Sequence, residues 1–293
     1  MFSQTGKHVR VLAVGNSFSN DATTYFPQIV KGSPVPCTLT LGKASIGGCD
    51  FARHLRHATL HEADPTDPEG KPYSNKTKSL KEMLLAEPWD FVTMQQVSTK
   101  SFRPETFRPE AKQLYDYIKR YAPQSEVVIH QTWAYRADEP RFGTAFCGSQ
   151  QAMYEGLCKA YAEIAGELGC RLIQSGDAME LARRDAQWGG VFPDVNFDTK
   201  TATYPNLPDQ RYSLHVGYSW RKEKDQWKLM YDGIHANIAG DYLTGCVWFE
   251  FFFETTVVGN TFVPDKMDTK DASILQRIAH EIREYNIGLV KKP

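Results

Sequence analysis

Short apolar runs alternate with longer segments of helical periodicity along most of the chain. Runs rich in β-branched and apolar residues predict strands at residues 9–14, 37–41, 91–95, 127–130 and 171–173. Apolar residues at helical spacing predict helices at residues 24–30, from 51 onward, and at 80–86, 106–121, 150–168 and 177–184. Strand and helix therefore alternate with short connections, which is typical of a parallel sheet covered on both faces. We expect a doubly wound α/β fold with a five-stranded parallel sheet.

Two stretches interrupt the alternation. Residues 61–79 are rich in Asp, Pro, Lys and Asn, which predicts a surface insertion. Residues 188–228 are aromatic and rich in Pro and Asp, which indicates a small hairpin or a lid beside the site. Closing helices are predicted at residues 237–253 and 273–285. Because no repeat, low-complexity tract or linker divides the chain, we expect residues 1–293 to form a single domain.

The charge and the apolar content narrow the choice of partners. The chain has 34 basic and 35 acidic residues and a formal net charge of −1, so it lacks the basic footprint of a nucleic-acid-binding or membrane-surface protein. The most apolar run, residues 246–253, is too short for a membrane span and contains Glu250, which indicates a buried helix. Residues 1–8 are too short and polar for a signal peptide. As given, the sequence predicts a cytoplasmic location, and a periplasmic or secreted one would require a leader that had been removed.

The first predicted strand is followed directly by Gly15-Asn16-Ser17. Ligands bind at the carboxyl ends of the strands in open α/β sheets, so a serine here can present its hydroxyl and its backbone N–H to a substrate. Serine at this place is also a common helix N-cap. The tripeptide alone supports both interpretations.

The sequence Asp232-Gly-Ile-His235 supplies a candidate general base. A carboxylate three residues before a histidine, in a loop that opens a helix, can orient the imidazole and leave its other nitrogen for a nucleophile. The chain has eight histidines, and a single histidine is usually a structural or surface residue. The glycine inside the motif and the apolar helix after it favour the catalytic interpretation.

Donors for a developing oxyanion are available after three of the predicted strands. The candidates are the backbone N–H groups of Ser17 and Gly48 and the side-chain amide of Gln95 or Gln96. A Gly-Gly pair is equally typical of a plain turn, and a Gln pair of a strand cap. Their shared position after consecutive strands is what points to a single site.

These motifs, in this order, resemble the SGNH (GDSL-like) hydrolase superfamily. The resemblance rests on Gly15-Asn-Ser-Phe-Ser19, Gly48, the polar end of the third strand and Asp232-Gly-Ile-His235. Gln95-Gln-Val-Ser98 and Thr132-Trp-Ala134 further resemble an uncharacterised SGNH-like bacterial subgroup, DUF4886. The likeness covers residues 9–255.

The resemblance implies a flavodoxin-like three-layer α/β/α sandwich and ester hydrolysis through an acyl-enzyme, without a metal or other cofactor. It implies that Ser17 is the nucleophile, His235 the base and Asp232 its orienter, with Asn16 and Trp133 as substrate-contacting candidates. The superfamily's third block is Gly-x-Asn-Asp, and this chain has Met-Gln-Gln-Val-Ser at residues 94–98 instead. The usual asparagine donor is therefore missing, and the choice between the two glutamines stays open.

We accordingly expect a serine esterase that deacylates, and in particular deacetylates, a carbohydrate or other small ester. Aromatic residues that could stack on sugar rings are Trp133, Trp188, Tyr204, Tyr218 and Trp220. A thioesterase or peptidase could use the same triad. The alternative of a different class is a catalytically weak glycan-binding module that has lost the oxyanion amide.

A metal-dependent phosphoesterase is a third alternative, which would use Asp21, Asp232, His235 and His130. Its ligand spacing is not evident, and the six cysteines contain no C-x-x-C pair that would suggest a zinc site.

Overall fold

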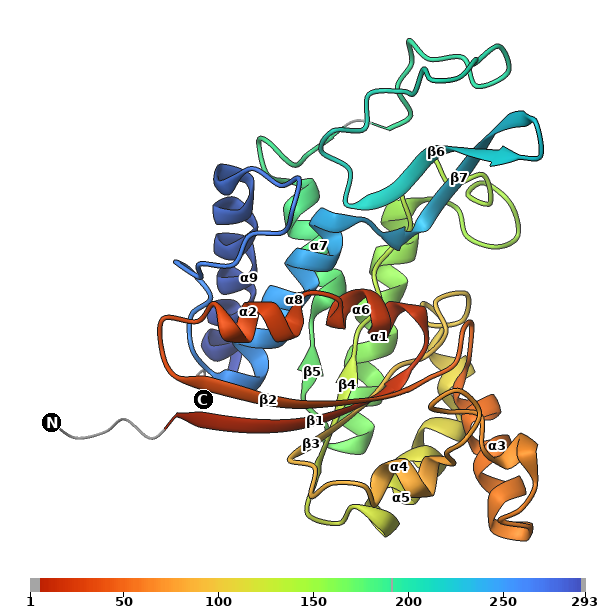
Figure 1. Cartoon of the computed structure of the whole chain (residues 1–293), viewed down its shortest axis with the longest axis vertical. Coiled ribbons are helices and arrows are strands. Elements are labelled where there is room, and N and C mark those ends of the chain that lie inside the picture. The colour runs from red at the N-terminus through yellow and green to blue at the C-terminus, as the bar shows by residue number, and fades with distance from the viewer. Residues whose placement is uncertain (1–5, 191, 291–293) are drawn as a thin grey trace, which may run out of the picture.

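The computed structural model of the chain describes residues 6–190 and 192–290 (Figure 1). Its centre is a parallel sheet of five strands in the order β2-β1-β3-β4-β5. The strands are β1 (Lys7–Gly15), β2 (Cys37–Ser45), β3 (Phe91–Met94), β4 (Glu126–His130) and β5 (Leu172–Ile173). All five lie where the apolar runs predict them, and the α/β fold with its five-stranded parallel sheet is confirmed.

The strand order reverses direction at β1. From β1 the chain crosses to β2 on one side of the sheet and then to β3 on the other. Loops leaving the carboxyl ends of β1 and β3 therefore part at this point, which is where open α/β sheets bind their ligands. The segment that follows β1 begins with Ser17.

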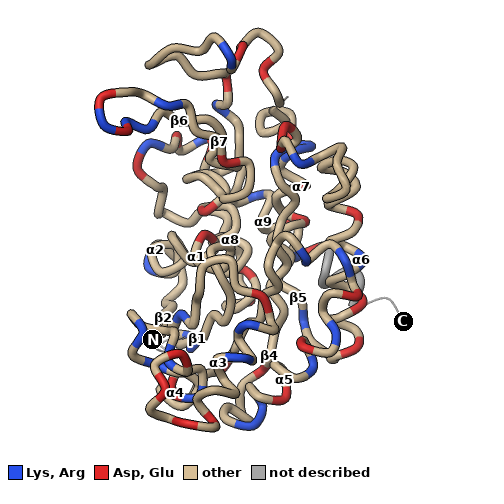
Figure 2. The backbone as a smooth tube through the Cα atoms, turned by 90° about the vertical axis from the view of Figure 1, so that its right-hand side faces the viewer, with Lys and Arg blue, Asp and Glu red and all other residues tan. Residues whose placement is uncertain are grey.

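Helices cover both faces of the sheet. On one side α8 packs against α1, α2, α7 and α9, and on the other α5 packs against α3, α4 and α6 (Figure 1). The α-helices are α1 (Ser17–Thr23), α2 (Phe26–Lys31), α3 (Phe51–Ala63), α4 (Leu80–Leu84), α5 (Glu110–Tyr121), α6 (Gln150–Leu168), α7 (Ser175–Arg183), α8 (Ile238–Phe253) and α9 (Thr269–Val290). Two short 3₁₀ helices are η1 (Pro68–Gly70) and η2 (Pro104–Phe107). Basic and acidic residues are interspersed along the chain (Figure 2), as the near-zero net charge predicts.

The helix α8 is apolar on nearly all sides because it is enclosed between the sheet and other helices. Trp248, Phe249 and Phe252 are fully buried, and Trp248 packs edge-on against Phe26 of α2. The prediction of a buried helix at the most apolar run is therefore confirmed. Among the described residues, no helix combines the length and the apolar character needed to cross a membrane.

A second, two-stranded sheet stands apart from the first at the top of Figure 1. It is an antiparallel hairpin of β6 (His215–Glu223) and β7 (Gln226–Ala236). The expected hairpin is thus present, but β7 continues well beyond the predicted stretch. Asp232 pairs with Gly217 across this hairpin, so Asp232 and His235 lie on a strand rather than in a loop that opens a helix. The expectation of a loop was wrong because the polar end of β7 lacks a strand-like apolar pattern.

Other differences are local. A separate helix begins at Ser17, ahead of the predicted start at residue 24, since the Asn16 side chain accepts a hydrogen bond from the Phe18 N–H and caps it. The expected surface insertion at residues 61–79 is partly anchored, because Tyr73 is fully buried and its hydroxyl lies 2.7 Å from His54 Nδ1.

A buried carboxylate joins α8 to α9. Glu250 is 1% exposed and accepts hydrogen bonds from the Val257 N–H (2.5 Å), His280 Nδ1 (3.1 Å) and Arg283 Nη1 (3.3 Å). Burial raises the pKa of Glu250 above its ordinary value, and these donors oppose that rise. These hydrogen bonds offset the free-energy cost of burying the Glu250 carboxylate.

We predict that Glu250→Ala lowers the free energy of unfolding by about 2–3 kcal/mol, because it leaves the half-buried side chains of Arg283 and His280 without their carboxylate partner. The measurement is urea denaturation of the wild type and the variant. Glu281→Ala, which removes an exposed ion pair with Arg277 on the same helix, is the control and should cost less than about 1 kcal/mol. Equal losses for the two variants would show that the buried network does not join these helices.

Candidate active site

The end of β1 places Ser17 at the switch point of the sheet. A Cβ atom added to Gly15 would lie 2.3 Å from Ser19 Oγ and 2.7 Å from Gln95 Oε1, so only glycine fits there. Asn16 adopts an extended conformation and caps α1, which makes Ser17 the first helical residue. The tight turn from strand to helix therefore leaves the serine hydroxyl at the carboxyl edge of the sheet.

Ser17, His235 and Asp232 form a continuous chain of hydrogen bonds. Ser17 Oγ lies 2.9 Å from His235 Nε2, and His235 Nδ1 lies 2.8 Å from Asp232 Oδ2. The second carboxylate oxygen, Oδ1, accepts hydrogen bonds from the backbone N–H groups of Ile234 (2.9 Å) and His235 (3.0 Å). With the Nδ1 proton directed to the carboxylate, Nε2 is left to accept the serine proton, which is the arrangement of a nucleophile, a base and an orienting acid.

The ionised forms of Asp232 and His235 stabilise each other. Burial disfavours ionisation of Asp232, but the hydrogen bonds from the His235 side chain and the two N–H groups outweigh it and hold the Asp232 pKa well below its ordinary value. The hydrogen bond to Asp232 raises the pKa of His235 above its ordinary value, against the opposing effect of burial. The site therefore stabilises the imidazolium that forms when His235 takes up a proton.

Trp133 contacts the backbone beside His235 and the side chain beside Ser17. Its indole N–H donates to the backbone carbonyl of Ile234 at 3.0 Å, and its ring packs against Phe18 with centroids 4.4 Å apart. The side chain is fully buried. The expectation that Trp133 lines a substrate pocket is therefore corrected, because Trp133 instead ties the β7 segment between Asp232 and His235 to α1.

The loop after β2 runs beside the serine. The Ile46 N–H donates to the Gly15 carbonyl (3.1 Å), and Asn16 Nδ2 donates to the Cys49 carbonyl (2.9 Å), so the loop that contains Gly48 is bonded to the two residues before Ser17. Gly48 has φ +60°, where L side chains are strained. Within the described chain, the backbone N–H groups of Ser17 and Gly48 donate to no acceptor. Both are available to an oxyanion.

The two glutamines have internal partners instead. Gln95 Oε1 accepts from the Asn16 N–H (3.2 Å) and Ser19 Oγ (3.0 Å), and its amide donates to the Gln96 carbonyl. The Gln96 amide donates to the Thr106 carbonyl at 2.9 Å. Asn16 is 1% exposed and occupied by its cap and its bond to Cys49. The expectations of a Gln95 or Gln96 oxyanion donor and of a substrate-contacting Asn16 thus differ from the structure, in which all three side chains brace the loops.

Comparison with known proteins agrees with this arrangement. The family description "Domain of unknown function (DUF4886)" matches residues 10–201. The chain belongs to the DUF4886 family. A DUF4886 family protein from Bacteroides uniformis superimposes with a TM-score of 0.73 at 24% identity, over 96% of each chain. A protein from Slackia heliotrinireducens, described as a candidate SGNH hydrolase, gives 0.50 at 19% identity, over 83% of this chain and 98% of that one.

These similarities extend to the fold of the SGNH hydrolases, which this DUF4886 chain shares. No curated protein matches the chain.

Asp21, one helical turn after Ser17, was considered from the sequence only as a metal ligand. In this DUF4886 protein its Oδ2 accepts from the Ala236 N–H at 3.1 Å, which joins α1 to the residue after His235. Burial raises the Asp21 pKa to about 6, and its charge raises the His235 pKa. Asp21 lies four residues after Ser17 on a helix, which places the two side chains on the same face, and this spacing is the sequence signal for a role of Asp21 in the site. Asp241 lies near it, and burial raises the Asp241 pKa to about 8.

The residues of the metal alternative do not converge. His130 is fully buried, lies 3.0 Å from Ser175 Oγ through Nε2 and packs edge-on against Trp248. In the described parts of the chain, no group of three or more His, Cys, Asp or Glu side chains has the arrangement of a metal site.

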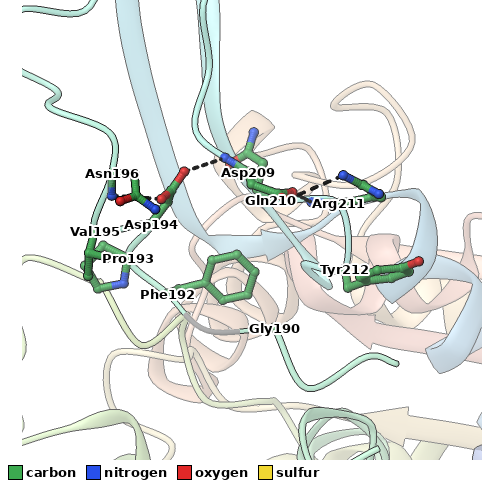
Figure 3. Close-up of a pocket in the computed structure, with 10 residues that line it drawn as sticks. All are labelled: Gly190, Phe192, Pro193, Asp194, Val195, Asn196, Asp209, Gln210, Arg211 and Tyr212. Atoms are coloured by element: carbon green, nitrogen blue, oxygen red, sulfur yellow. Dashed lines mark hydrogen bonds and ion pairs between the residues drawn. The ribbon is translucent and has the colours of Figure 1, made fainter. Parts of the chain in front are cut away.

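A pocket of about 500 Å³ opens beside the triad. Its lining comes from the segment after β4 and from the β6–β7 hairpin, and comprises Glu139, Pro140, Arg141, Val216, Ser219, Arg221, Met230, Tyr231, Asp232, Gly233, Ile234 and His235. A second pocket of about 290 Å³ is formed by residues 190, 192–196 and 209–212 (Figure 3). None of the triad residues lines it, so the first pocket is the candidate substrate site.

We predict that Asp21→Asn lowers the pKa of His235 by about half a pH unit, because it removes a nearby negative charge and keeps an oxygen for the Ala236 N–H. Asp232→Asn should lower the His235 pKa further, since Asp232 bonds the ring directly. NMR titration of the His235 ring nitrogens measures both shifts. An unchanged or raised His235 pKa in Asp21→Asn would contradict the electrostatic coupling.

Proposed function

We propose that this protein is a serine esterase of the SGNH type that removes an acyl group, in particular acetyl, from a carbohydrate or other small ester. The proposal rests chiefly on the unbroken hydrogen-bonded chain from Ser17 Oγ through His235 to Asp232. It takes residues 1–293 as one domain, because the serine comes from the first strand and the base from the last part of the chain.

The geometry supports a two-step reaction. Ser17 Oγ attacks the acyl carbon while its proton passes to His235 Nε2, and the negative charge of the tetrahedral intermediate is received by the N–H groups of Ser17 and Gly48. The imidazolium then gives that proton to the leaving alcohol, which yields the acyl-enzyme. In the second step His235 accepts a proton from water as the water attacks the acyl carbon, and it returns the proton to Ser17 as the acid leaves.

The preorganisation of the loops supports catalysis over simple binding. Gln95, Asn16 and Trp133 are buried, and each bonds a backbone group within two residues of Ser17, Gly48 or His235. Such bracing fixes the direction of N–H groups and ring nitrogens, which is what charge stabilisation in a transition state requires. A module that only bound glycans would not need a serine hydroxyl aligned with an imidazole.

One observation favours the alternative of a catalytically weak glycan-binding module. The Gln95 amide donates to the Gln96 carbonyl, so this side chain does not supply a third oxyanion donor. The loss of one donor typically costs about 10²–10³-fold in rate, which is much less than the acceleration that an esterase achieves. We therefore propose a slower esterase rather than an inactive one.

We predict that Ser17→Ala and His235→Ala each reduce hydrolysis of p-nitrophenyl acetate by about 10⁴-fold or more, because they remove the nucleophile or its base. Wild-type activity should be indifferent to a chelator. A fluorophosphonate probe should label the wild type and spare Ser17→Ala, and thermal unfolding should show that both variants are folded. Labelling or full activity of Ser17→Ala would overturn the triad, and an unlabelled, inactive wild type would support the binding module.

A further inference from the structure

The two faces of the β6–β7 hairpin differ in chemistry. Cross-strand pairs place Ser219 opposite Met230 and Arg221 opposite Lys228, and alternation along β7 puts both pairs on the same face as Asp232. Ser219, Arg221, Met230 and Asp232 all line the 500 Å³ pocket. One face of the hairpin is therefore the wall of the candidate substrate site.

The aromatic residues are on the opposite face. Trp227 stacks on Tyr204 with ring centroids 3.8 Å apart, and the Trp220 indole N–H donates to the Asn206 carbonyl. Tyr218 and Tyr231 flank the guanidinium of Arg136. Trp220 and Trp227 thus hold the hairpin to the segment before it, and the two tyrosines hold it to the segment after β4. Tyr204, Tyr218 and Trp220, expected from the sequence to stack on sugars, thus have partners within the protein.

Among the described residues, the charged side chains of the pocket wall have partners of opposite charge, apart from that of Arg221. Glu139 pairs with Arg141 at 2.6 Å, and Asp232 pairs with His235 at 2.8 Å. Arg221 forms no ion pair with any residue that the structure describes, whereas its cross-strand neighbour Lys228 lies 3.9 Å from Glu223. Basic and acidic residues are visible together at the tip of the hairpin (Figure 2).

The position of Arg221 is set by the strand. Its partner Lys228 precedes Asp232 by four residues, which corresponds to about 13 Å along β7 at ~3.3 Å per residue. The Glu139 carboxylate is paired with Arg141, whereas Asp232 keeps its negative charge beside a His235 that is neutral before it takes up the serine proton, so an anion is repelled near the triad. A negative group is therefore best received at the far end of the pocket, where a guanidinium can bond carboxylate, sulfate or phosphate oxygens in a bidentate manner.

We propose that the pocket selects esters that carry a fixed negative charge remote from the reacting acyl carbon, at the end of the pocket toward the tip of the β6–β7 hairpin, with Arg221 as the residue that recognises the charge. This inference rests on the proposed esterase function and names its substrate class. The substrate is then an ester of an acidic compound, such as an oligosaccharide that bears carboxylate or sulfate groups, rather than a neutral lipid.

The test compares acetylated trigalacturonate with acetylated xylotriose as substrates, with acetate release as the readout. The ratio of kcat/KM for the acidic over the neutral substrate should fall about tenfold in Arg221→Gln, because a charge-assisted hydrogen bond is lost. Lys222→Gln removes the same charge from the other face of the same strand, paired with Trp227, and should leave the ratio unchanged. High salt should reduce the wild-type preference.

A binding measurement separates this inference from the proposed function. Calorimetry with unacetylated trigalacturonate and xylotriose requires no catalysis, and Arg221→Gln should weaken binding of the acidic trimer alone, by about tenfold. If the wild type releases no acetate but binding still depends on Arg221, the esterase proposal fails and the anion site stands. Three results would overturn the proposed anion site. They are equal ratios or affinities in the wild type and Arg221→Gln, an equal effect of Lys222→Gln, and no binding of trigalacturonate by the wild type.

Discussion

The close packing of α1 and α2 against α8 is the constraint on which the site depends. Ser17 begins α1, and His235 lies one residue before the end of β7, shortly before α8, so the distance between these residues follows from how those helices meet. A Cβ atom on Gly245 of α8 would lie 2.9 Å from Ile29 Cδ1, and one on Gly240 would lie 2.3 Å from the Leu214 carbonyl. Small residues at these places let α8 approach its neighbours closely, and the Asp21 bond to the Ala236 N–H fixes the contact at the site itself.

Much of the fold could be predicted because its signals are local. Buried strands are short apolar runs, and α6 begins and ends at the predicted residues because Ser149 caps its start and Gly169, at φ +62°, ends it. The extension of β7 could not be predicted. Asp232, Gly233 and His235 have neither alternation nor β propensity. The pairing of Asp232 and Ala236 with β6 holds this segment in the strand, which is an effect that the local sequence does not encode.

The candidate site was likewise predictable from the sequence only in part. Ser17, Asp232 and His235 come together as expected, since each follows from a motif whose spacing fixes its local geometry. The expectations for Asn16, Gln95, Gln96 and Trp133 located them correctly at strand ends but did not establish where their side chains point. A strand end leaves a side chain free to face the substrate or the core, and only the surrounding loops decide between these directions.

Those buried side chains explain how the candidate site can be well ordered although its proposed oxyanion donors are two backbone N–H groups. Gln95 accepts hydrogen bonds from the backbone of Asn16 and from Ser19, so the glutamine spans the carboxyl ends of β1 and β3. Asn16 in turn spans β1 and the loop after β2. The switch point of the sheet is thereby crossed by amide side chains that leave the N–H groups of Ser17 and Gly48 without an acceptor among the described residues. In the proposed esterase, the Gln95 amide would support the loops rather than donate to the oxyanion, and stabilisation of the developing charge would fall to the backbone N–H groups of Ser17 and Gly48.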